Sequence, residues 1–229
     1  MKMKALIFPS FIILVLFAGC KKDREVIPPL PSPPNEVIYP NFSQLKAGNY
    51  WVYQQFIVDS SGNATPTNVY DSCYVEKDTL INNNTYFKVY RPIPGMPQWG
   101  YTYLRDSLHY IVCYRNFQNQ SSKICFSSQD FNTTFYSYHM TYGNLQDTIA
   151  LVTAKMEDPG LIVSTPAGSF ETSTFKINYN YGANWDDFGN PRHQNTRYSE
   201  GVGIVSEELP HIYSNPNYLE RRLVRYQVN

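Results

Sequence analysis

The side chains that most often carry out catalysis are scattered along this sequence. Its four histidines have neither the His-Glu-x-x-His spacing nor a close cysteine, so they do not form a zinc-binding pattern. These histidines are His109, His139, His193 and His211. Gly201-Val202-Gly203 lacks the third glycine and the following helix of a dinucleotide-binding loop, and Ser169 is not in a Gly-x-Ser-x-Gly motif. We therefore predict no catalytic residue, no metal site and no cofactor, and we do not expect an enzyme.

Two pairs of acidic residues are further candidates for polar chemistry. Asp186-Asp187 lies in the polar stretch 184–195, whose oxygens could reach calcium, but the stretch lacks the regularly alternating acids of a calcium loop. Glu207-Glu208 could act in a glycosidase only opposite another carboxylate across a cleft, which a sequence cannot place. We expect a solvated turn at the first pair and a solvated strand end at the second.

The first nineteen residues have the form of a secretory signal peptide. Lys2 and Lys4 are followed by a mostly apolar run, residues 5–16, and then by the small residues Ala18-Gly19. The run is shorter than the roughly 20 apolar residues that a transmembrane helix needs. We therefore expect residues 1–19 to be removed on export.

The end of this segment, Phe17-Ala18-Gly19-Cys20, resembles the bacterial lipobox, with Phe17 in the place of the usual leucine. The resemblance implies cleavage before Cys20, diacylglycerol on its thiol, and a fatty acyl chain such as palmitate on its new amino group. Two or more chains hold a protein stably on a bilayer, whereas one chain does not. The alternative is an ordinary signal peptide with an incidental cysteine.

Residues 20–40 comprise the lipidated Cys20 and a tether to the domain that follows. Six of residues 21–40 are proline, which excludes a helix and makes a semi-rigid spacer. The charged run 21–25 resembles the export signal of surface lipoproteins of the Bacteroidota, so we expect an outer-membrane location, on the cell surface rather than the periplasmic face. Removal of residues 1–19 leaves 17 basic and 19 acidic residues, and this balance does not indicate nucleic-acid binding.

Three cysteines remain in the exported chain, where disulfides can form. Cys113 and Cys125 flank the turn-like stretch 116–123. A hairpin centred near Asn119 would place the two cysteines opposite each other, so we predict a Cys113–Cys125 bridge with Cys73 left as a thiol. The alternative is three buried thiols.

Three short segments share the order Asp, hydroxyl residue, aliphatic residue: 78–80, 106–108 and 147–149. They are similar to the acceptor pattern of the general O-glycosylation system of the Bacteroidota. This similarity makes Thr79, Ser107 and Thr148 candidate O-glycosylation sites. The alternative is turn formation, because Asp and Ser or Thr start turns through side-chain to backbone hydrogen bonds.

The remaining residues, 41–229, have the composition of an all-β domain. Aromatic residues make up 16% of the chain, and Tyr, Phe, Thr and Val favour strands. In residues 174–181, one face of a period-two pattern is apolar and the other polar, as in a half-buried strand. Similar strands are predicted at 49–58, 85–90, 108–114, 123–128, 148–156 and 219–228. About ten such strands with short connections predict a single antiparallel curved sheet, either a barrel or a sandwich.

Two loops carry tryptophans that we predict as candidate ligand contacts. Trp99 lies in the Pro-rich stretch 91–101, and Trp185 lies in the polar stretch noted above. Aromatic rings on loops can stack on sugars or anchor a protein partner. Packing over the end of the sheet is the alternative for both, whereas Trp51 alternates with Tyr53 in a strand and is expected in the core.

Three stretches, 40–53, 164–176 and 198–208, contain a Gly-x-Tyr-Trp, a Pro-Ala-Gly-x-Phe and a Gly-Val-Gly pattern in this order. Together they resemble a group of bacterial, Bacteroidota-type outer-membrane lipoproteins that have no established activity. The resemblance implies a curved antiparallel sheet, of the kind that periplasmic lipoprotein carriers use. It places no catalytic residue on this chain.

These observations favour a lipid-anchored envelope protein with a non-catalytic binding or structural role. Its expected partners are the membrane, through the anchor, and a polysaccharide or an envelope protein. The alternative is a periplasmic carrier or chaperone for lipid or lipoprotein, whose sheet would enclose an unfilled apolar cavity. The two hypotheses therefore differ in what fills the interior of the sheet.

Overall fold

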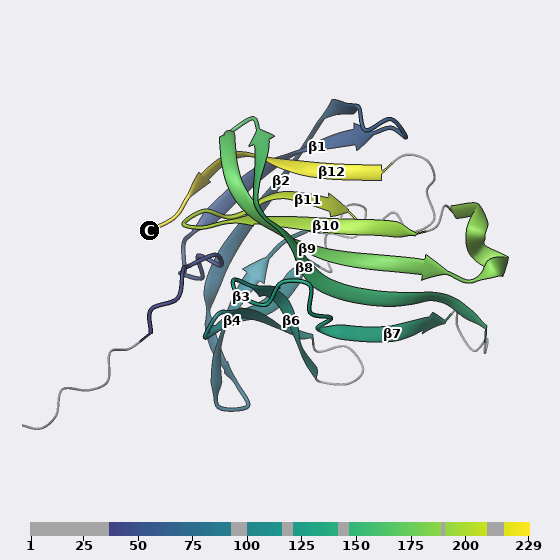
Figure 1. Cartoon of the computed structure of the whole chain (residues 1–229). Coiled ribbons are helices and arrows are strands. Elements are labelled where there is room, and N and C mark those ends of the chain that lie inside the picture. The colour runs from purple at the N-terminus through teal and green to yellow at the C-terminus, as the bar shows by residue number, and fades with distance from the viewer. Residues whose placement is uncertain (1–36, 93–99, 116–120, 142–146, 189–190, 210–217) are drawn as a thin grey trace, which may run out of the picture. The chain divides into compact units, whose positions relative to one another are not determined.

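The described strands all belong to one antiparallel sheet. The structure, a computed structural model, describes residues 37–92, 100–115, 121–141, 147–188, 191–209 and 218–229 (Figure 1). The sheet has twelve strands in the order β6-β5-β4-β3-β2-β1-β12-β11-β10-β9-β8-β7. A 3₁₀ helix, η2 (Ala183–Phe188), follows β9. The all-β prediction is therefore confirmed.

The strand bounds show that each of the seven predicted strands forms, some of them longer than expected. The first six are β1 (Tyr50–Val58), β2 (Ala64–Ile81), β3 (Asn84–Tyr90), β4 (Tyr101–Ser107), β5 (Tyr110–Arg115) and β6 (Ser121–Ser127). The second six are β7 (Tyr136–Thr141), β8 (Thr148–Thr165), β9 (Gly168–Tyr181), β10 (Arg192–Ser199), β11 (Gly203–Leu209) and β12 (Tyr218–Gln227).

The sheet is curved until it is nearly closed, like a barrel. The edge strands β6 and β7 follow each other in sequence, although eleven strand spacings separate them in the sheet. Eleven spacings would span about 53 Å in a flat sheet, whereas the link from Ser127 to Tyr136 can reach only about 30 Å. The sheet must therefore curl. Lys123 Nζ of β6 lies 4.8 Å from the ring centroid of Tyr138 of β7, so side chains join the two edges.

The concave face of the sheet carries the apolar core. Alternation along β9 places Phe175, Tyr179 and Tyr181 in buried clusters, as the period-two pattern predicted. A third buried cluster contains Trp51, Tyr53 and aliphatic residues of β2, β3, β11 and β12. The predicted core position of Trp51 is confirmed, since its exposed fraction is 6%.

The three sequence patterns of the lipoprotein resemblance meet at Trp51. Trp51 Nε1 donates a hydrogen bond to Val202 O at 2.7 Å. A Cβ on Gly203, whose φ is +99°, would lie 3.4 Å from the Trp51 ring, so glycine permits the close approach of backbone and indole. Ala167 and Phe170 of the β8–β9 hairpin pack against the same cluster. These patterns thus describe packing rather than a reactive site.

The turn of that hairpin has the glycine where a positive φ is required. Thr165 pairs with Gly168, so Pro166 and Ala167 form the turn. Gly168 has a φ of +135°, which few other residues adopt. Ala167 N also donates to Leu223 O at 3.0 Å, which ties the turn to β12.

Candidate functional site

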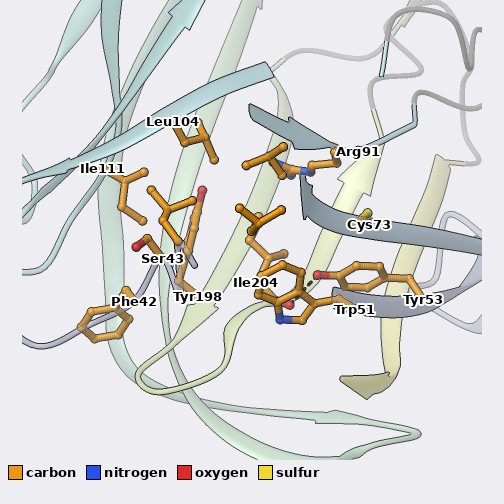
Figure 2. Close-up of a pocket in the computed structure, with 13 residues that line it drawn as sticks. Phe42, Ser43, Trp51, Tyr53, Cys73, Arg91, Leu104, Ile111, Tyr198 and Ile204 are labelled. Atoms are coloured by element: carbon orange, nitrogen blue, oxygen red, sulfur yellow. Dashed lines mark hydrogen bonds between the residues drawn. The ribbon is translucent and has the colours of Figure 1, made fainter. Parts of the chain in front are cut away.

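An apolar cavity lies inside the curved sheet (Figure 2). Its volume is about 40 Å³. One water needs about 10–15 Å³, so the cavity is large enough for only a few waters. Side chains from the segment before β1 and from the concave face line it: Phe42, Ser43, Leu45, Trp51, Tyr53, Cys73, Val75, Val89, Arg91, Leu104, Ile111, Tyr198 and Ile204.

The two buried tyrosines and the cysteine that line the cavity are held in their neutral forms. Tyr53 donates its hydroxyl proton to Ile204 O at 2.8 Å, and burial raises the pKa of Tyr53. Burial also raises the pKa of Tyr198 and of the Cys73 thiol. A reactive cysteine needs a lowered pKa, because the thiolate is the nucleophile. Cys73 is therefore a structural thiol at neutral pH.

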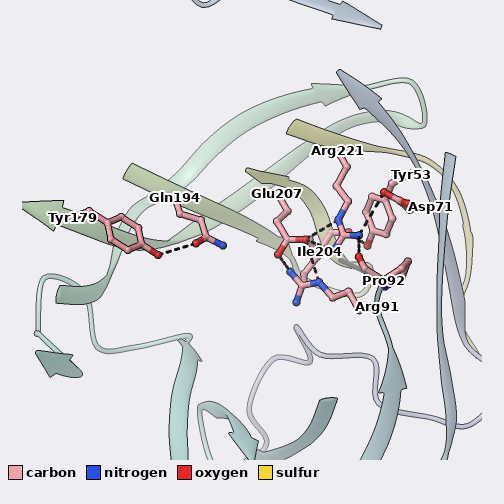
Figure 3. A network of polar contacts seen from close by, with 9 residues as sticks. All are labelled: Tyr53, Asp71, Arg91, Pro92, Tyr179, Gln194, Ile204, Glu207 and Arg221. Atoms are coloured by element: carbon pink, nitrogen blue, oxygen red, sulfur yellow. Dashed lines mark hydrogen bonds and ion pairs between the residues drawn. The ribbon is translucent and has the colours of Figure 1, made fainter. Parts of the chain in front are cut away.

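Arg91 connects the cavity to a buried ionic network (Figure 3). Arg91 and Arg221 both donate to the carboxylate of Glu207, with Arg91 Nε at 3.1 Å and Arg221 Nε at 2.8 Å from Oε2. Arg221 also donates to Pro92 O at 3.0 Å and lies 3.7 Å from Asp71 Oδ2. The side chains of Arg221 and Glu207 are only 3% and 9% exposed. Two cations and two carboxylates thus compensate one another inside the sheet.

This network corrects the interpretation of Glu207-Glu208 as a solvated strand end. Alternation along β11 directs Glu207 to the concave face and Glu208 to the opposite face, and both residues are buried. Glu208 accepts hydrogen bonds from Asn195 N at 3.0 Å and from Asn195 Nδ2 at 2.8 Å. Burial raises the pKa of Glu208, and the charge of Glu220 directly opposite on β12 adds to the shift. Acidic residues in a strand cannot be recognised as buried until their arginine partners are known.

Four tyrosines form a row across the convex face of β1, β2, β3 and β4. The strand register places Tyr50 opposite Tyr74, Tyr74 opposite Tyr90, and Tyr90 opposite Tyr101. Their chain neighbours Trp51, Cys73 and Val89 lie in the buried cluster, so alternation directs the four rings outward. We call Tyr50, Tyr74, Tyr90 and Tyr101 the tyrosine row.

Tyr74, Tyr90 and Tyr101 contact one another in succession, and the row remains accessible to solvent. The ring centroids of Tyr74 and Tyr90 are 5.2 Å apart, and those of Tyr90 and Tyr101 are 5.1 Å apart. Tyr101 is 44% exposed, and the other three are half-buried. Lys88 Nζ lies 3.9 Å from the Tyr101 ring centroid and forms an ion pair with Glu76 at 2.9 Å. A hydrogen bond with Tyr74 raises the pKa of Tyr101 to about 12, with smaller contributions from desolvation and Glu76.

Sequence reasoning did not find the tyrosine row. Tyr50, Tyr74 and Tyr90 are each one position away from a core residue, which is a visible signal for an outward-facing ring. The alignment of the four rings depends on strand register, which the sequence of a single strand does not contain. The row was also hidden because β2 and β4 were not predicted as strands.

The predicted Cys113–Cys125 disulfide is wrong: both cysteines keep their thiols. The register of β5 and β6 pairs Cys113 with Lys123, and a bulge displaces Cys125 from the ladder. Cys113 Sγ lies 3.2 Å from Thr102 Oγ1, and Cys125 Sγ donates to Ile111 O at 3.4 Å. The alternative of thiols in the folded domain therefore holds, with Cys73 and Cys113 buried.

Three other predicted site residues are Cys20, Trp99 and Trp185. Cys20 and Trp99 lie outside the described residues. Trp185 is in η2, half-buried, and packs against a cluster that contains Ile149 and Tyr181.

The three candidate glycosylation residues lie on strands rather than in one loop. Thr79 is in β2 opposite Tyr86, Ser107 ends β4, and Thr148 begins β8. Thr148 is exposed, and the other two are half-buried. The three candidates therefore differ in accessibility, and their modification stays a prediction.

Two further properties concern the described part of the chain. Among its residues, no group of three or more His, Cys, Asp or Glu side chains could hold a metal ion. None of the helices in that part is long and apolar enough to cross a membrane.

Comparison with known proteins gives two similar solved structures. No protein-family model and no curated protein matches the chain. One structure is a Bacteroides fragilis protein described as exported and as having a YmcC-like fold, with 12% identity, a TM-score of 0.46, and coverage of 82% of this chain and 99% of that one. The other is a Parabacteroides distasonis protein described as a lipoprotein, with 13% identity, a TM-score of 0.38, and coverage of 83% and 100%.

Proposed function

We propose that this protein is a lipid-anchored envelope protein whose β domain binds a partner without catalysing a reaction. The anchor is Cys20, the tether is the Pro-rich segment up to residue 40, and the location is the outer surface of the outer membrane. The partner is a polysaccharide or another envelope protein, and nucleic acid is not expected. The signal-peptide pattern, the lipobox resemblance and the near-neutral charge support this proposal.

The observation that carries the binding role is the occupied interior of the sheet. Among the described residues, core side chains and the Arg91–Glu207–Arg221 network border a cavity of about 40 Å³. A lipid carrier needs an interior that takes up an acyl chain of many methylene groups. The convex face, by contrast, presents accessible aromatic rings without any rearrangement. Ligand contact on the outside is therefore favoured over transport inside.

The carrier remains the second candidate, because the cavity is apolar and lies in a curved sheet. Uptake of a fluorescent fatty acid by the full-length protein tests it directly. We expect no saturable uptake. Saturable uptake that is lost on Ile204→Phe, which fills the cavity, and kept on Ile162→Phe, which is at an exposed position, would establish the carrier instead.

The location is tested by digesting intact cells with a protease that cannot cross the outer membrane. We expect prompt loss of residues 41–229 while a periplasmic control protein stays intact. A Cys20→Ser variant should no longer be lipidated and should leave the membrane fraction. Protection of the wild-type domain until the cells are permeabilised would place it in the periplasm and contradict the surface location.

Modification of the exported chain is a separate part of the proposal. We expect diacylglycerol and acyl chains on Cys20 and glycans on Thr79, Ser107 or Thr148, of which Thr148 is exposed. The measurement is the intact mass of the protein from its native host. A mass equal to that of the lipidated but otherwise unmodified chain would reject glycosylation.

A further inference from the structure

We propose that the convex face of β2, β3 and β4 binds an acidic polysaccharide through a cluster of cations. We call Lys77, Lys88 and Arg105 the convex cation cluster. This inference rests on the proposed binding function and names the chemical class of the partner and the face that it contacts. It assigns no role to the inner cavity or to the two loop tryptophans.

Strand register brings the three cations together on the outside of the sheet. Lys77 of β2 is directly opposite Lys88 of β3, and Lys88 is directly opposite Tyr103 of β4. Arg105 follows Tyr103 by two residues on the same face, so it is a diagonal neighbour of Lys88. Val89 lies in the buried cluster around Trp51, and alternation therefore directs Lys88 and its cross-strand neighbours outward.

The convex cation cluster is not balanced by negative charge. In the part of the chain that the structure describes, Glu76 is the only carboxylate on the outward-facing side of β2, β3 and β4. It forms an ion pair with Lys88 at 2.9 Å; their hydrogen bond lowers the pKa of Glu76, and the charge of Lys77 adds to this shift. Arg225 of β12, exposed and opposite Val52, adds a further cation to the same face. The face therefore carries an excess of positive charge, although the exported chain is nearly neutral.

The two acidic residues next to the cluster in sequence belong to the concave side of the sheet. Asp78 is opposite Phe87, which packs against the buried cluster around Trp51. Asp106 accepts a hydrogen bond at 2.6 Å from Ser43, which lines the inner cavity. Neither carboxylate therefore compensates the cations of the convex face.

Arg105 is the member of the cluster whose binding capacity is least used. Its guanidinium carbon lies 5.5 Å from the ring centroid of Tyr86, which is 3% exposed, so the arginine is held against the sheet. Its Nε is buried and has no hydrogen-bond partner among the described residues. Buried polar atoms without a partner are destabilising, and so are like charges directly opposite each other, as Lys77 and Lys88 are. An anion bound on this face would offset both effects.

A chain of sugar rings that carry carboxylates complements this cluster. The planar guanidinium group binds a carboxylate through two parallel hydrogen bonds. The cations are spread over three strands with a spacing of about 4.8 Å, so an occupant with several carboxylates fits better than a single small anion. Tyr101 beside them is 44% exposed and Tyr103 is half-buried. A tyrosine ring can contact the C–H face of a sugar while its hydroxyl group hydrogen-bonds.

Other acidic partners fit this face less well. An extended acidic peptide adds to a sheet at its edge, whereas β2, β3 and β4 each have strands on both sides. A bilayer with anionic lipids is flat, whereas the sheet is curled until it is nearly closed, so only a narrow line of it could touch the headgroups (Figure 1). A flexible polymer can follow the curvature and contact all three strands.

The test is affinity electrophoresis of the full-length protein, in mild non-ionic detergent, through native gels that contain one polymer each. The acidic polysaccharides are polygalacturonate and alginate, the neutral polysaccharide is dextran, and polyglutamate presents carboxylates without sugar rings. We expect retardation by at least one acidic polysaccharide, less by polyglutamate and none by dextran. High salt should abolish the retardation, because it screens charges at the surface. Lys77→Gln and Arg105→Gln should each weaken the binding by about three- to tenfold.

Lys88→Gln and Lys176→Gln form a matched pair of variants. Each lysine has a side chain that is 23% exposed and pairs with a glutamate at 2.9 Å. Lys176 lies on β9, six positions from β3 in the sheet, so its variant should bind like the wild type, whereas Lys88→Gln should bind more weakly. Thermal unfolding of each variant checks that the domain is folded. Lys77 is exposed, so Lys77→Gln keeps the test decisive if Arg105→Gln is unstable.

Three results would overturn the inference: retardation by neither acidic polysaccharide, equal retardation by dextran, or equal losses in Lys88→Gln and Lys176→Gln. Retardation by polyglutamate that equals the retardation by the acidic polysaccharides would replace the polysaccharide by an acidic protein partner. Cosedimentation of Cys20→Ser with phosphatidylglycerol vesicles, without any gel retardation, would replace it by the membrane surface. In each case the proposed binding function would stand, because it fails on a different result, saturable fatty-acid uptake that depends on Ile204.

Discussion

Replacing Glu207 by glutamine should destabilise the domain strongly, because this carboxylate compensates two buried cations. Arg91 and Arg221 both donate to it, and Arg221 is 3% exposed at its side chain. Glu207→Gln keeps the size and removes the charge. Arg221 then retains Pro92 O and the carboxylate of Asp71 at 3.7 Å, whereas Arg91 loses its ionic partner.

The magnitude follows from the cost of leaving a buried charge without its partner, which is about 3–5 kcal/mol. Because Asp71 stays near Arg221, we expect the lower end, about 3 kcal/mol. Small domains have a free energy of unfolding of about 5–15 kcal/mol, so this loss is a large fraction of the total. For a domain of this size it corresponds to a fall in Tm of roughly 6–12 °C.

Urea unfolding at neutral pH, followed by tryptophan fluorescence, measures the effect. Trp51 is a natural probe, since its indole is buried and hydrogen-bonded to Val202. Glu157→Gln is the matched control: Glu157 also contacts two cations, Lys155 and Lys176, but these side chains are 30% and 23% exposed. Exposed pairs contribute about 0–1 kcal/mol. Equal losses in the two variants would refute the argument that burial makes the Glu207 network costly to break.

Three further predictions concern packing, ionisation and thiol state. Gly203→Ala should lower the free energy of unfolding by about 1–3 kcal/mol, because the φ of Gly203 is +99° and the new Cβ would meet the indole ring of Trp51. The control is Gly201→Ala, whose Cβ would be in open space and which should lose less stability. A larger loss in Gly201→Ala would contradict the close-packing argument. Burial raises the pKa of Tyr53 in the folded state. The contribution of Tyr53 to stability is therefore retained below about pH 10, the pKa of an unfolded tyrosine, and falls above it by about 1.4 kcal/mol per pH unit. When the free energy of unfolding is measured by urea at several pH values above about 10, Tyr53→Phe should show a pH dependence weaker by that amount, and an unchanged pH dependence would be evidence against this prediction. Alkylation after unfolding without reductant should label Cys113 and Cys125, and a linked peptide in the mass spectrum would show that the register of β5 and β6 is incorrect.

The strands that sequence reasoning found are those with a clean two-residue period. In β9, the apolar residues alternate with polar ones and the prediction holds. Strands β2, β4, β7 and β10 were missed, because their exposed faces are rich in polar residues and tyrosine, and both faces of β7 are largely exposed. The alternation of apolar and polar residues reflects which side chains are buried, so a strand with few buried side chains is hard to recognise in the sequence.

The disulfide prediction failed for a related reason. It assumed an uninterrupted ladder around a hairpin centred near Asn119, whereas Arg115 pairs with Ser121 and a bulge follows at Cys125. One residue of slip moves a side chain to another partner, and a bulge changes the count again. Spacing along the chain therefore cannot decide which cysteines meet.

Local sequence was enough to predict that the domain is all-β and that Trp51 lies in the core, because the alternation of apolar and polar residues acts over a few residues. The pairing of β1 with β12 is non-local, and so are the near-closure of the sheet, the burial of Glu207 between two arginines and the alignment of the tyrosine row. Each of these depends on register between segments that are distant in the chain. Register is set by the packing of the whole sheet, so these features exist only once the chain has folded.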